Sequence, residues 1–443
     1  MPSRSIAVVG AGLAGMRACE GLRARGFDGR ITLIGDEPHA PYDRPPLSKQ
    51  FLAGEWGIDR VMLQTSDQLG ALELDLRLGP PHRAIGLDLG ERRLSLAGGA
   101  VVAFDGLVVA TGSHARRLPG ISDLRGTHVL RTLDDAIALR DGLSRPGVHL
   151  GLAGAGFIGL EVAATARRLG AEVTIVEPLD VPLGRVLGPV AGRACEAMHR
   201  DEGVRFHLET TIESAEVSEH APVSAGGAAS AATDSGPIRC RLSDGTTLEV
   251  DALLVGIGAA PSVEWLHGSG LRADSDGVRC DESLVTAPGV VVAGDVARWP
   301  LRGAGGMRPA TPGPAGAADE TVRVEHRTNA AEQGDVAAAS LLTNLGWLVA
   351  PSADAAEGPP AYLVPYVWSD QFDVKIQVLG LPRPDDEVVV VDGDLAERRF
   401  VLLHGRGGRL EAVVGFRRPR IVMSLRPLLE RRATLEEAIA HVG

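Results

Sequence analysis

Short apolar runs alternate with amphipathic helical segments through the first two-thirds of the chain. The runs SIAVVGAG and RITLIGDE flank the helical pattern MRACEGLRARGF, and VHLGLAGAG and EVTIVEP flank LEVAATARRLG in the same order. Apolar runs between helical segments are typical of a buried parallel sheet. The pattern therefore predicts an α/β fold, and its recurrence indicates a duplicated βαβ unit.

The rest of the chain shows three further features. Additional apolar runs predict strands at 104–113, 250–261 and 288–297. Two stretches rich in Ala, Gly, Pro and Ser, at 219–237 and 302–320, are expected to form mobile surface loops. Beyond Thr328, β-rich segments and a helical end predict a separate C-terminal α+β domain.

Each repeated unit carries the motif Gly-x-Gly-x-x-Gly between its first strand and its helix. In such a unit the first glycine makes a tight turn, the second lets the backbone approach a pyrophosphate, and the third packs the helix against the strand. The free N–H groups at the helix N-terminus then attract the anion. The sequence predicts two dinucleotide sites, on the triads Gly10, Gly12, Gly15 and Gly154, Gly156, Gly159.

An acidic residue near the end of the second strand of each unit fits this interpretation. Glu177 ends EVTIVE, where a carboxylate accepts ribose hydroxyls and repels a 2′-phosphate, so the second site is expected to prefer NADH over NADPH. Aligning the two units puts Gly35 opposite Glu177, so the first site is expected to use Asp36 or Glu37. The natural pair of ligands is FAD and NADH, because a flavin accepts a hydride and returns single electrons.

Composition narrows the function classes. The net charge of −12 over 443 residues argues against nucleic-acid binding. No uninterrupted apolar run is long enough to cross a membrane, and the first strand begins too early to leave room for a signal peptide, so a cytoplasmic protein is expected. The four cysteines have no spacing typical of a disulfide framework, a zinc site or a redox dithiol, and are expected to be ordinary semi-buried thiols.

Five motifs in a fixed order resemble the FAD-dependent NADH:ferredoxin reductases of oxygenase systems. They are PYDRPPLSKQFL, ATGSHARRLPG, GAGFIGLE, AGDVA and PYVWSDQFDVKIQ, and they span nearly the whole chain. The resemblance implies two Rossmann-like domains of the glutathione-reductase type and a C-terminal α+β interface domain. The expected boundaries are 1–118 and 251–325 for FAD, 119–250 for NAD, and 326–443 for the interface domain.

The resemblance also implies which residues hold FAD. Arg44 is expected near the diphosphate, and Lys49 near the flavin ring, where an ammonium would stabilise negative charge on the reduced ring. Asp295 is expected to accept a hydrogen bond from the ribityl chain, and Trp368 to lie against the ring and exclude water. The alternatives are a surface lysine, a helix N-cap and a core tryptophan. Further FAD contacts are implied for Ala14, Ala84, Thr111, Gly112, Arg131 and His326.

The implied NAD contacts lie around the second glycine loop. Phe157 and Ile158 are expected to border the nicotinamide, and Glu161 to hold its carboxamide, the alternative for Glu161 being a first-turn acid favoured by the helix dipole. Arg185 is expected to contact the adenosine or to be an exposed surface residue. Gly258 and Glu325 are expected near the junction of the cofactors. Arg327 stands where relatives carry tryptophan, which argues against a second aromatic lid.

The implied reaction passes a hydride from NADH to FAD and then single electrons to a 2Fe–2S ferredoxin, with Lys49, Glu161 and Trp368 acting at the reacting groups. The arginine-rich segment 416–432 is expected either to dock an acidic ferredoxin or to be a solvated helix face. A flavoprotein disulfide reductase needs a cysteine pair that residues 41–52 lack. A rubredoxin reductase, or a redox-sensing interaction protein resembling apoptosis-inducing factor, stays open. The chain is expected to be a monomer or weak homodimer.

Overall fold

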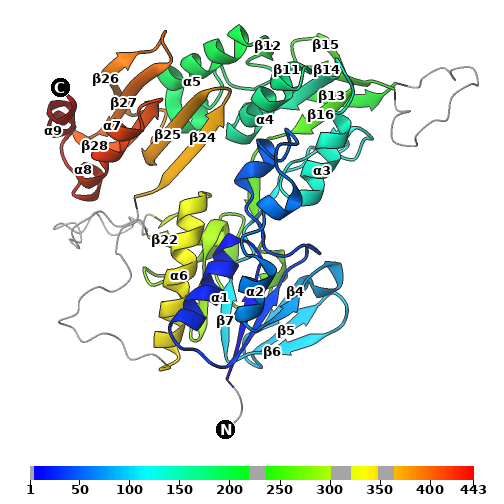
Figure 1. Ribbon diagram of the computed structural model, residues 1–443, viewed down its shortest axis with the longest axis vertical. Helices are drawn as coiled ribbons and strands as arrows, with labels where there is room; N and C mark the ends of the chain where they lie inside the picture. Colours follow the sequence, from blue (N-terminus) through cyan, green and yellow to red (C-terminus); the bar gives the residue numbers. More distant parts are fainter. Residues whose placement is uncertain (1–3, 219–235, 301–320, 348–363) are drawn as a thin grey trace, which may run out of the picture.

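The computed structural model describes residues 4–218, 236–300, 321–347 and 364–443. These residues form two lobes, with the N-terminal domain in one and the second and C-terminal domains in the other (Figure 1). Of the two predicted loops, all of 302–320 and all but the last two residues of 219–237 lie outside the described residues.

The first domain is a six-stranded sheet in the order β20-β21-β7-β1-β2-β3. Its central strands pair in parallel, as the apolar runs predict. Helices α1 (Leu13–Ala24) and α6 (Arg327–Asn344) share one core with the sheet, and the three-stranded sheet β4-β5-β6 shares a core with its other face. The strands are β1 (Ser5–Val9), β2 (Arg30–Ile34), β3 (Leu74–Arg77), β4 (Ala84–Asp88), β5 (Arg93–Leu96), β6 (Val101–Ala103), β7 (Gly106–Val109), β20 (Val285–Ala287) and β21 (Val290–Val292).

The second domain repeats this plan. Its five strands pair in parallel in the order β12-β11-β10-β16-β9, and a three-stranded antiparallel sheet β13-β14-β15 packs beside them. The strands are β9 (Thr127–His128), β10 (His149–Ala153), β11 (Glu172–Val176), β12 (Val204–His207), β13 (Ile212–Val217), β14 (Ile238–Leu242), β15 (Thr247–Val250) and β16 (Ala252–Val255), and the helices are α3 (Leu133–Gly142), α4 (Phe157–Arg168) and α5 (Gly184–Asp201).

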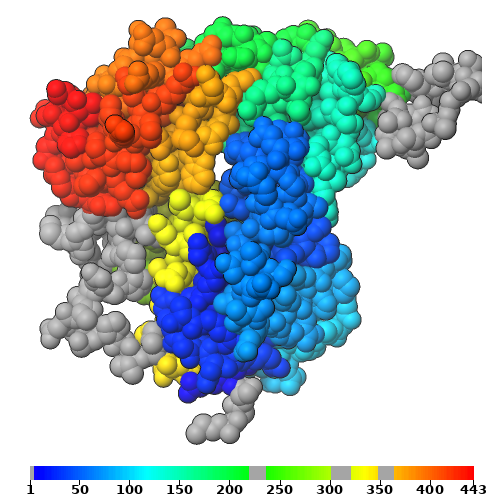
Figure 2. Space-filling view, in the orientation of Figure 1, coloured from blue at the N-terminus to red at the C-terminus, as the bar shows by residue number. Residues whose placement is uncertain are grey.

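The C-terminal domain is an antiparallel sheet in the order β24-β25-β28-β27-β26, as its β-rich pattern predicts. One face packs on its own short helices and the other shares a core with α5, so this domain lies directly against the second domain (Figure 2). The elements are β24 (Tyr366–Gln371), β25 (Val374–Gly380), β26 (Glu387–Asp394), β27 (Arg399–Arg406), β28 (Arg409–Phe416), α7 (Pro419–Ser424), α8 (Arg426–Glu430) and α9 (Leu435–Val442).

Three of the described segments join the first and second domains. The strands β8 (Ser113–Ala115) and β17 (Ala259–Pro261) pair antiparallel, so the two chain crossings between the first and second domains run side by side. Leu47, Phe51 and Leu52 of the first domain are buried in the core that contains α3 and α4, and the blue segment around them reaches into the upper lobe (Figure 2). The remaining elements are α2 (Ser66–Ala71) and the small sheet of β18 (Ala273–Asp274), β19 (Gly277–Arg279), β22 (Ala297–Pro300) and β23 (Thr321–Val322).

Two of the expected domain boundaries differ from the structure. Strand β16 pairs with β10 in the second sheet, so the boundary expected at 250/251 is one strand too early. Helix α6 packs on α1 and buries Ala337, Ala338 and Leu341 in the core of the first sheet, so the boundary expected at 325/326 is also too early. An apolar helix face shows that a helix packs on something, but not on which sheet.

Candidate dinucleotide and redox site

The first glycine loop has the geometry of a phosphate cradle. Gly10 has φ 117°, and a Cβ atom added there would lie 2.0 Å from the Ala110 carbonyl oxygen. A Cβ at Gly15 would lie 1.9 Å from the Gly10 carbonyl oxygen, whereas a Cβ at Gly12 would meet nothing within 4 Å. Gly12 is also the N-cap of α1, where no side chain caps the free N–H groups. The outer glycines are required by packing, and the middle one faces open space, as a bound pyrophosphate needs.

The second loop repeats the same geometry. Gly154 has φ 102°, and an added Cβ would lie 2.6 Å from the Gly256 carbonyl oxygen. At Gly159 it would lie 2.7 Å from the Gly154 carbonyl oxygen, while Gly156 again has nothing within 4 Å. Gly156 is the uncapped N-cap of α4. The chain thus holds two equivalent cradles, each open only at its middle glycine.

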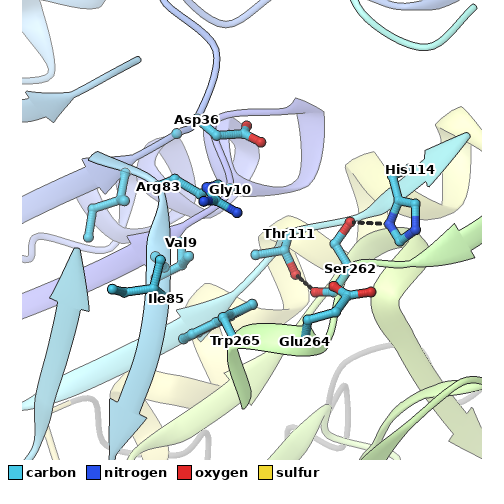
Figure 3. A pocket seen from close by; sticks show the side chains of 13 residues that line it. Val9, Gly10, Asp36, Arg83, Ile85, Thr111, His114, Ser262, Glu264 and Trp265 are labelled. Carbon is cyan, nitrogen blue, oxygen red and sulfur yellow. Dashed lines mark hydrogen bonds between the residues drawn. The ribbon is translucent and has the colours of Figure 1, made fainter. Parts of the chain in front are cut away.

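A cavity of about 390 Å³ lies beside the first cradle (Figure 3). Asp36, Ala84 and Thr111, all predicted FAD contacts, line it together with Trp265 and Gly10. The Thr111 hydroxyl donates to the Ser262 carbonyl oxygen at 2.7 Å. This hydrogen bond joins two segments of the chain that both line the cavity. The cavity is lined by the first glycine of the cradle and by an acid just after β2, two features that a site for the adenosine half of a dinucleotide needs.

Glu37, the alternative acid, is engaged elsewhere. Its carboxylate accepts hydrogen bonds from the Tyr42 hydroxyl and, at 2.7 Å, from Arg44. Arg44 also donates to the Arg131 carbonyl oxygen, and burial raises the pKa of Tyr42. Glu37 therefore positions Arg44, and Asp36 is the acid that faces the cavity.

Asp295 lies inside a short 3-10 turn, and its side chain does not cap it. Asp295 Oδ2 accepts hydrogen bonds from Arg131 at 2.9 Å and from the Ser113 hydroxyl at 3.0 Å. Gly112, at φ 65°, precedes Ser113, and Ala14 packs beside Gly294. These contacts bring Asp295, Arg131, Gly112 and Ala14 to the carboxyl end of the first sheet, next to the cradle.

Lys49 is not a surface lysine. Its ammonium lies 2.8 Å from Glu161 Oε2, and both side chains are only 7% exposed. The Ser48 hydroxyl donates to the same oxygen, and the Ser369 hydroxyl donates to Oε1 at 2.7 Å. A buried carboxylate with an ammonium and two hydroxyl donors is fully satisfied, which a first-turn acid held only by the helix dipole would not be.

The region between the domains holds the remaining predicted flavin contacts. His326 is the N-cap residue of α6, its Nδ1 atom is buried without a partner, and burial lowers its pKa to about 4. Trp368 is half-buried on β24, and its ring stacks on Tyr366 with centroids 5.8 Å apart. An orphaned buried ring nitrogen and a partly open aromatic face fit a planar polar ligand.

Arg327 and Glu325 lie at the same junction. Arg327 Nε donates to both Asp43 carboxylate oxygens, at 2.8 and 2.9 Å, which ties the start of α6 to the DRPPLSK segment. Glu325 is exposed and pairs with Arg323. Arg327 therefore takes a structural ion-pair role in place of an aromatic lid.

At the second cradle, Phe157 and Ile158 are the first two residues of α4, and Ile158 is 45% exposed. Glu177 is buried, with Oε2 accepting from the Ala155 N–H at 2.7 Å and Oε1 from the Leu179 N–H at 3.1 Å. It therefore braces the glycine loop from the residue that follows β11. Arg185 is exposed, and Gly258 has φ 98°, a conformation that favours glycine, with no atom within 4 Å of where a Cβ would lie.

Several residues at the site were not predicted from the sequence. Ser48 and Ser369 lie inside two of the motifs that the sequence analysis identified. Nothing in the sequence indicated that their hydroxyl groups would contact Glu161. Gln371 and His199 continue the hydrogen bonds from Ser369 and carried no signal, because they meet only in the folded chain. Trp265, Arg83, His114, Ser262 and Glu264 line the cavity in the same way.

Two kinds of feature are absent from the part of the chain that the structure describes. No helix in those ranges combines the length and the apolar character needed to span a membrane. Among the same residues, no three His, Cys, Asp or Glu side chains are grouped as metal ligands.

Comparison with known proteins gives consistent matches. A family model described as pyridine nucleotide-disulphide oxidoreductase matches residues 4–334, and one described as reductase C-terminal matches residues 366–441. The chain is 36% identical over 435 residues to the ferredoxin reductase component of chlorobenzene dioxygenase from Cupriavidus sp. (strain PS12), covering 98% of this chain and 94% of that protein. It is 33% identical to putidaredoxin reductase from Pseudomonas putida, covering 94% and 89%.

A solved structure is similar throughout. The covalent putidaredoxin reductase–putidaredoxin complex contains a chain that matches with a TM-score of 0.83 and 30% identity, over 99% of both chains. The start of the second matched family model at residue 366 coincides with the start of β24, in agreement with the boundary that the sheets define.

Proposed function

The chain belongs to the pyridine nucleotide-disulphide oxidoreductase family, and we propose that it is an FAD-dependent NADH:ferredoxin oxidoreductase. Its partner is a 2Fe–2S ferredoxin that serves a monooxygenase or dioxygenase; in support, one relative is named as the ferredoxin reductase component of a dioxygenase and another as putidaredoxin reductase. The observation that carries the proposal is the pair of equivalent cradles, each open only at its middle glycine, with the Lys49–Glu161 pair between the domains.

FAD, when bound, supplies the step between a two-electron donor and a one-electron acceptor. The residues that would hold it are the cradle of Gly12, the cavity with Asp36 and Thr111, and Arg44 and Asp295 near the diphosphate and ribityl chain. Asp36 is suited to the ribose because it faces the cavity, whereas Glu37 is occupied by Arg44 and Tyr42. Arg131 holds the Asp295 carboxylate in place through one charge-assisted hydrogen bond to Oδ2, at 2.9 Å.

NADH would be held by the second cradle. The α4 N-terminus offers uncapped N–H groups to its pyrophosphate, and Phe157 and Ile158 offer apolar surface to the nicotinamide. Glu177 at the ribose position repels a 2′-phosphate, which gives the preference for NADH over NADPH. Arg185 lies on the exposed start of α5, from which it can reach the adenosine.

The chain's own residues act mainly by positioning and electrostatics. Lys49 brings a positive charge into a buried region at the domain junction, and Glu161 holds that ammonium at 2.8 Å. Trp368, the residue before Ser369 on β24, would lie against the flavin ring and exclude water. No residue is required to act as a nucleophile or a general base.

The cysteines take no part in this chemistry. The four thiols are unpaired, and burial raises the pKa of both Cys19 and Cys195 to about 12 and that of Cys240 to about 11. A thiolate is the reactive form, so these side chains are inert at neutral pH. Unpaired thiols also suit a reducing compartment, and we place the protein in the cytoplasm on that ground and because NADH is its donor.

The first test measures the two ligand sites separately. FAD-loaded protein is mixed anaerobically with NADH or NADPH in a stopped-flow spectrometer, and the loss of flavin absorbance is followed. We expect rapid, saturable bleaching by NADH. Because Glu177 repels a 2′-phosphate, the ratio of the limiting rate constant to Kd should be at least about tenfold lower for NADPH. Equal rates with the two nucleotides would contradict the assignment of Glu177.

A further inference from the structure

A buried chain of polar side chains links all three domains. It begins at Lys49 of the first domain, continues through Glu161 on α4 of the second, and passes to Ser369 and Gln371 on β24 of the C-terminal domain. It ends at His199, on α5 of the second domain. Ser369, Gln371 and His199 are 0% exposed and lie beside the apolar core that α5 shares with the C-terminal sheet. Buried polar groups cost free energy unless satisfied, so a chain of this length calls for a function.

The direction of every hydrogen bond in the chain follows from the carboxylate. Glu161 can only accept, so the Ser369 hydroxyl donates to Oε1 at 2.7 Å. Ser369 Oγ then accepts from Gln371 Nε2 at 3.1 Å, which turns Gln371 Oε1 toward His199 Nε2 at 3.0 Å. The Nε2 atom of His199 must therefore carry the ring hydrogen and donate the hydrogen bond to Gln371 Oε1. All donors point the same way, toward the negative charge on Glu161.

His199 is suited to end such a chain. Burial lowers its pKa to about 4, so the ring is neutral at physiological pH. Its Nδ1 atom is buried without a partner, and its ring lies against Phe372 and Phe206, with centroids 5.0 and 6.3 Å away. The charged group that acts on it is Arg398, which also disfavours a second proton and is itself paired with Asp201 and Glu202.

We propose that Ser369 and Gln371 are positioning residues for hydride transfer, through which the C-terminal domain fixes the Glu161 carboxylate and hence the Lys49 ammonium. This deepens the proposed function and rests on it. Glu161 Oε2 is held by Lys49 and Ser48, and Ser369 holds Oε1. Without the Ser369 hydroxyl the carboxylate can rotate about its own axis, and the ammonium that it holds moves with it. Gln371 keeps the hydroxyl pointing at Glu161 by occupying its acceptor side.

The test compares Ser369→Ala with Ser369→Thr, which keeps the hydroxyl, and with Ser340→Ala, a buried serine on α6 of the first domain. We expect Ser369→Ala to retain FAD but to reduce the flavin about tenfold more slowly at saturating NADH, the effect of one hydrogen bond to a charged group. The flavin midpoint potential should shift as well. Ser369→Thr should recover the rate to within about threefold, and Ser340→Ala should change neither quantity.

A second variant reverses the polarity of the chain with little change of shape. In Gln371→Glu the new carboxylate can only accept, so the Ser369 hydroxyl turns toward it and away from Glu161. Flavin reduction should slow about as much as in Ser369→Ala, and the midpoint potential should shift in the same direction. This variant also decides the matter if Ser369→Ala fails to fold.

Two outcomes would overturn the proposal. One is an unchanged reduction rate and potential in Ser369→Ala or Gln371→Glu that binds FAD normally; the other is an equal loss in Ser369→Thr and Ser369→Ala, which would indicate packing alone. If NADH does not reduce the flavin of the unaltered protein, the proposed function fails. The midpoint potentials of the same variants, measured with a chemical reductant, then test the positioning by themselves.

Discussion

The two glycine cradles allow function to be separated from stability at neighbouring positions of one loop. Gly156 has an extended backbone, with φ −77° and ψ 178°, which alanine adopts freely, and an added Cβ would touch nothing. Gly156→Ala loses a favourable N-cap residue but restricts the unfolded chain, two effects of about 0.5–1 kcal/mol and opposite sign. The stability of the folded protein should therefore change by less than about 0.5 kcal/mol.

The binding of NADH should change much more. The methyl group of Gly156→Ala would occupy the space that a pyrophosphate needs, and would remove a hydrogen bond between a charged phosphate and a backbone N–H. Such a bond contributes about 1.5–3 kcal/mol, so the KM for NADH should rise about 10–100-fold. FAD content should stay unchanged, because FAD is assigned to the other cradle.

Two matched variants complete the experiment. Gly57→Ala has nearly the same backbone conformation, φ −79° and ψ 174°, and an equally open Cβ position, but lies outside both cradles, so neither stability nor KM should change. In Gly159→Ala the new Cβ would lie 2.7 Å from the Gly154 carbonyl oxygen, and overpacking should cost about 1–3 kcal/mol. The measurements are thermal unfolding at saturating FAD and steady-state KM. A Gly156→Ala variant with normal KM, or with lost FAD, would refute the assignment of the second cradle.

Three other predictions follow from buried titratable groups. Lys49→Met leaves the Glu161 carboxylate buried without its ammonium and should lower the free energy of unfolding by about 3–5 kcal/mol, with part recovered in the double variant with Glu161→Gln; additive losses in urea unfolding would contradict the pairing. His199 has its pKa lowered from 6.5 to about 4, so its contribution to stability is full above pH 6.5 and is lost as the pH falls toward 4. Unfolding free energies should therefore fall by up to about 1.4 kcal/mol per pH unit in that window, and less steeply in His199→Gln; equal slopes would refute this. The buried thiols should react with a disulfide reagent at pH 7.5 only when the protein unfolds. Fast reaction of the folded protein, with loss of activity, would instead support a disulfide reductase that uses a cysteine pair.

The parts of the site that depend on local geometry could be predicted from the sequence. Both cradles are each made within one strand–turn–helix unit, so the spacing of their glycines was enough to place Gly12 and Gly156 at the helix N-termini. The strands after them were equally clear, because a buried parallel strand is a short apolar run. Both apolar patterns and turn residues act over a few neighbours along the chain.

The parts of the site that depend on contacts between distant segments could not be predicted from the sequence. The choice between Asp36 and Glu37 is made by Tyr42 and Arg44, which take up Glu37 and leave Asp36 facing the cavity. The domain of α6 was assigned wrongly because its partner, α1, is some three hundred residues earlier in the chain. His199 carried no signal, since a histidine on a helix gains its meaning only from what packs against it.

The most direct test of the central claim is NADH-driven reduction of cytochrome c by the FAD-loaded protein, with and without a 2Fe–2S ferredoxin. Electron delivery to a ferredoxin predicts a rate that rises in proportion to the ferredoxin over its low-concentration range and is small in its absence, with NADPH a poor donor. A rate near background across a panel of two-iron ferredoxins, with flavin that NADH bleaches only slowly, would contradict the account. The two cradles would then belong to a protein that senses NADH or reduces a different acceptor, such as rubredoxin.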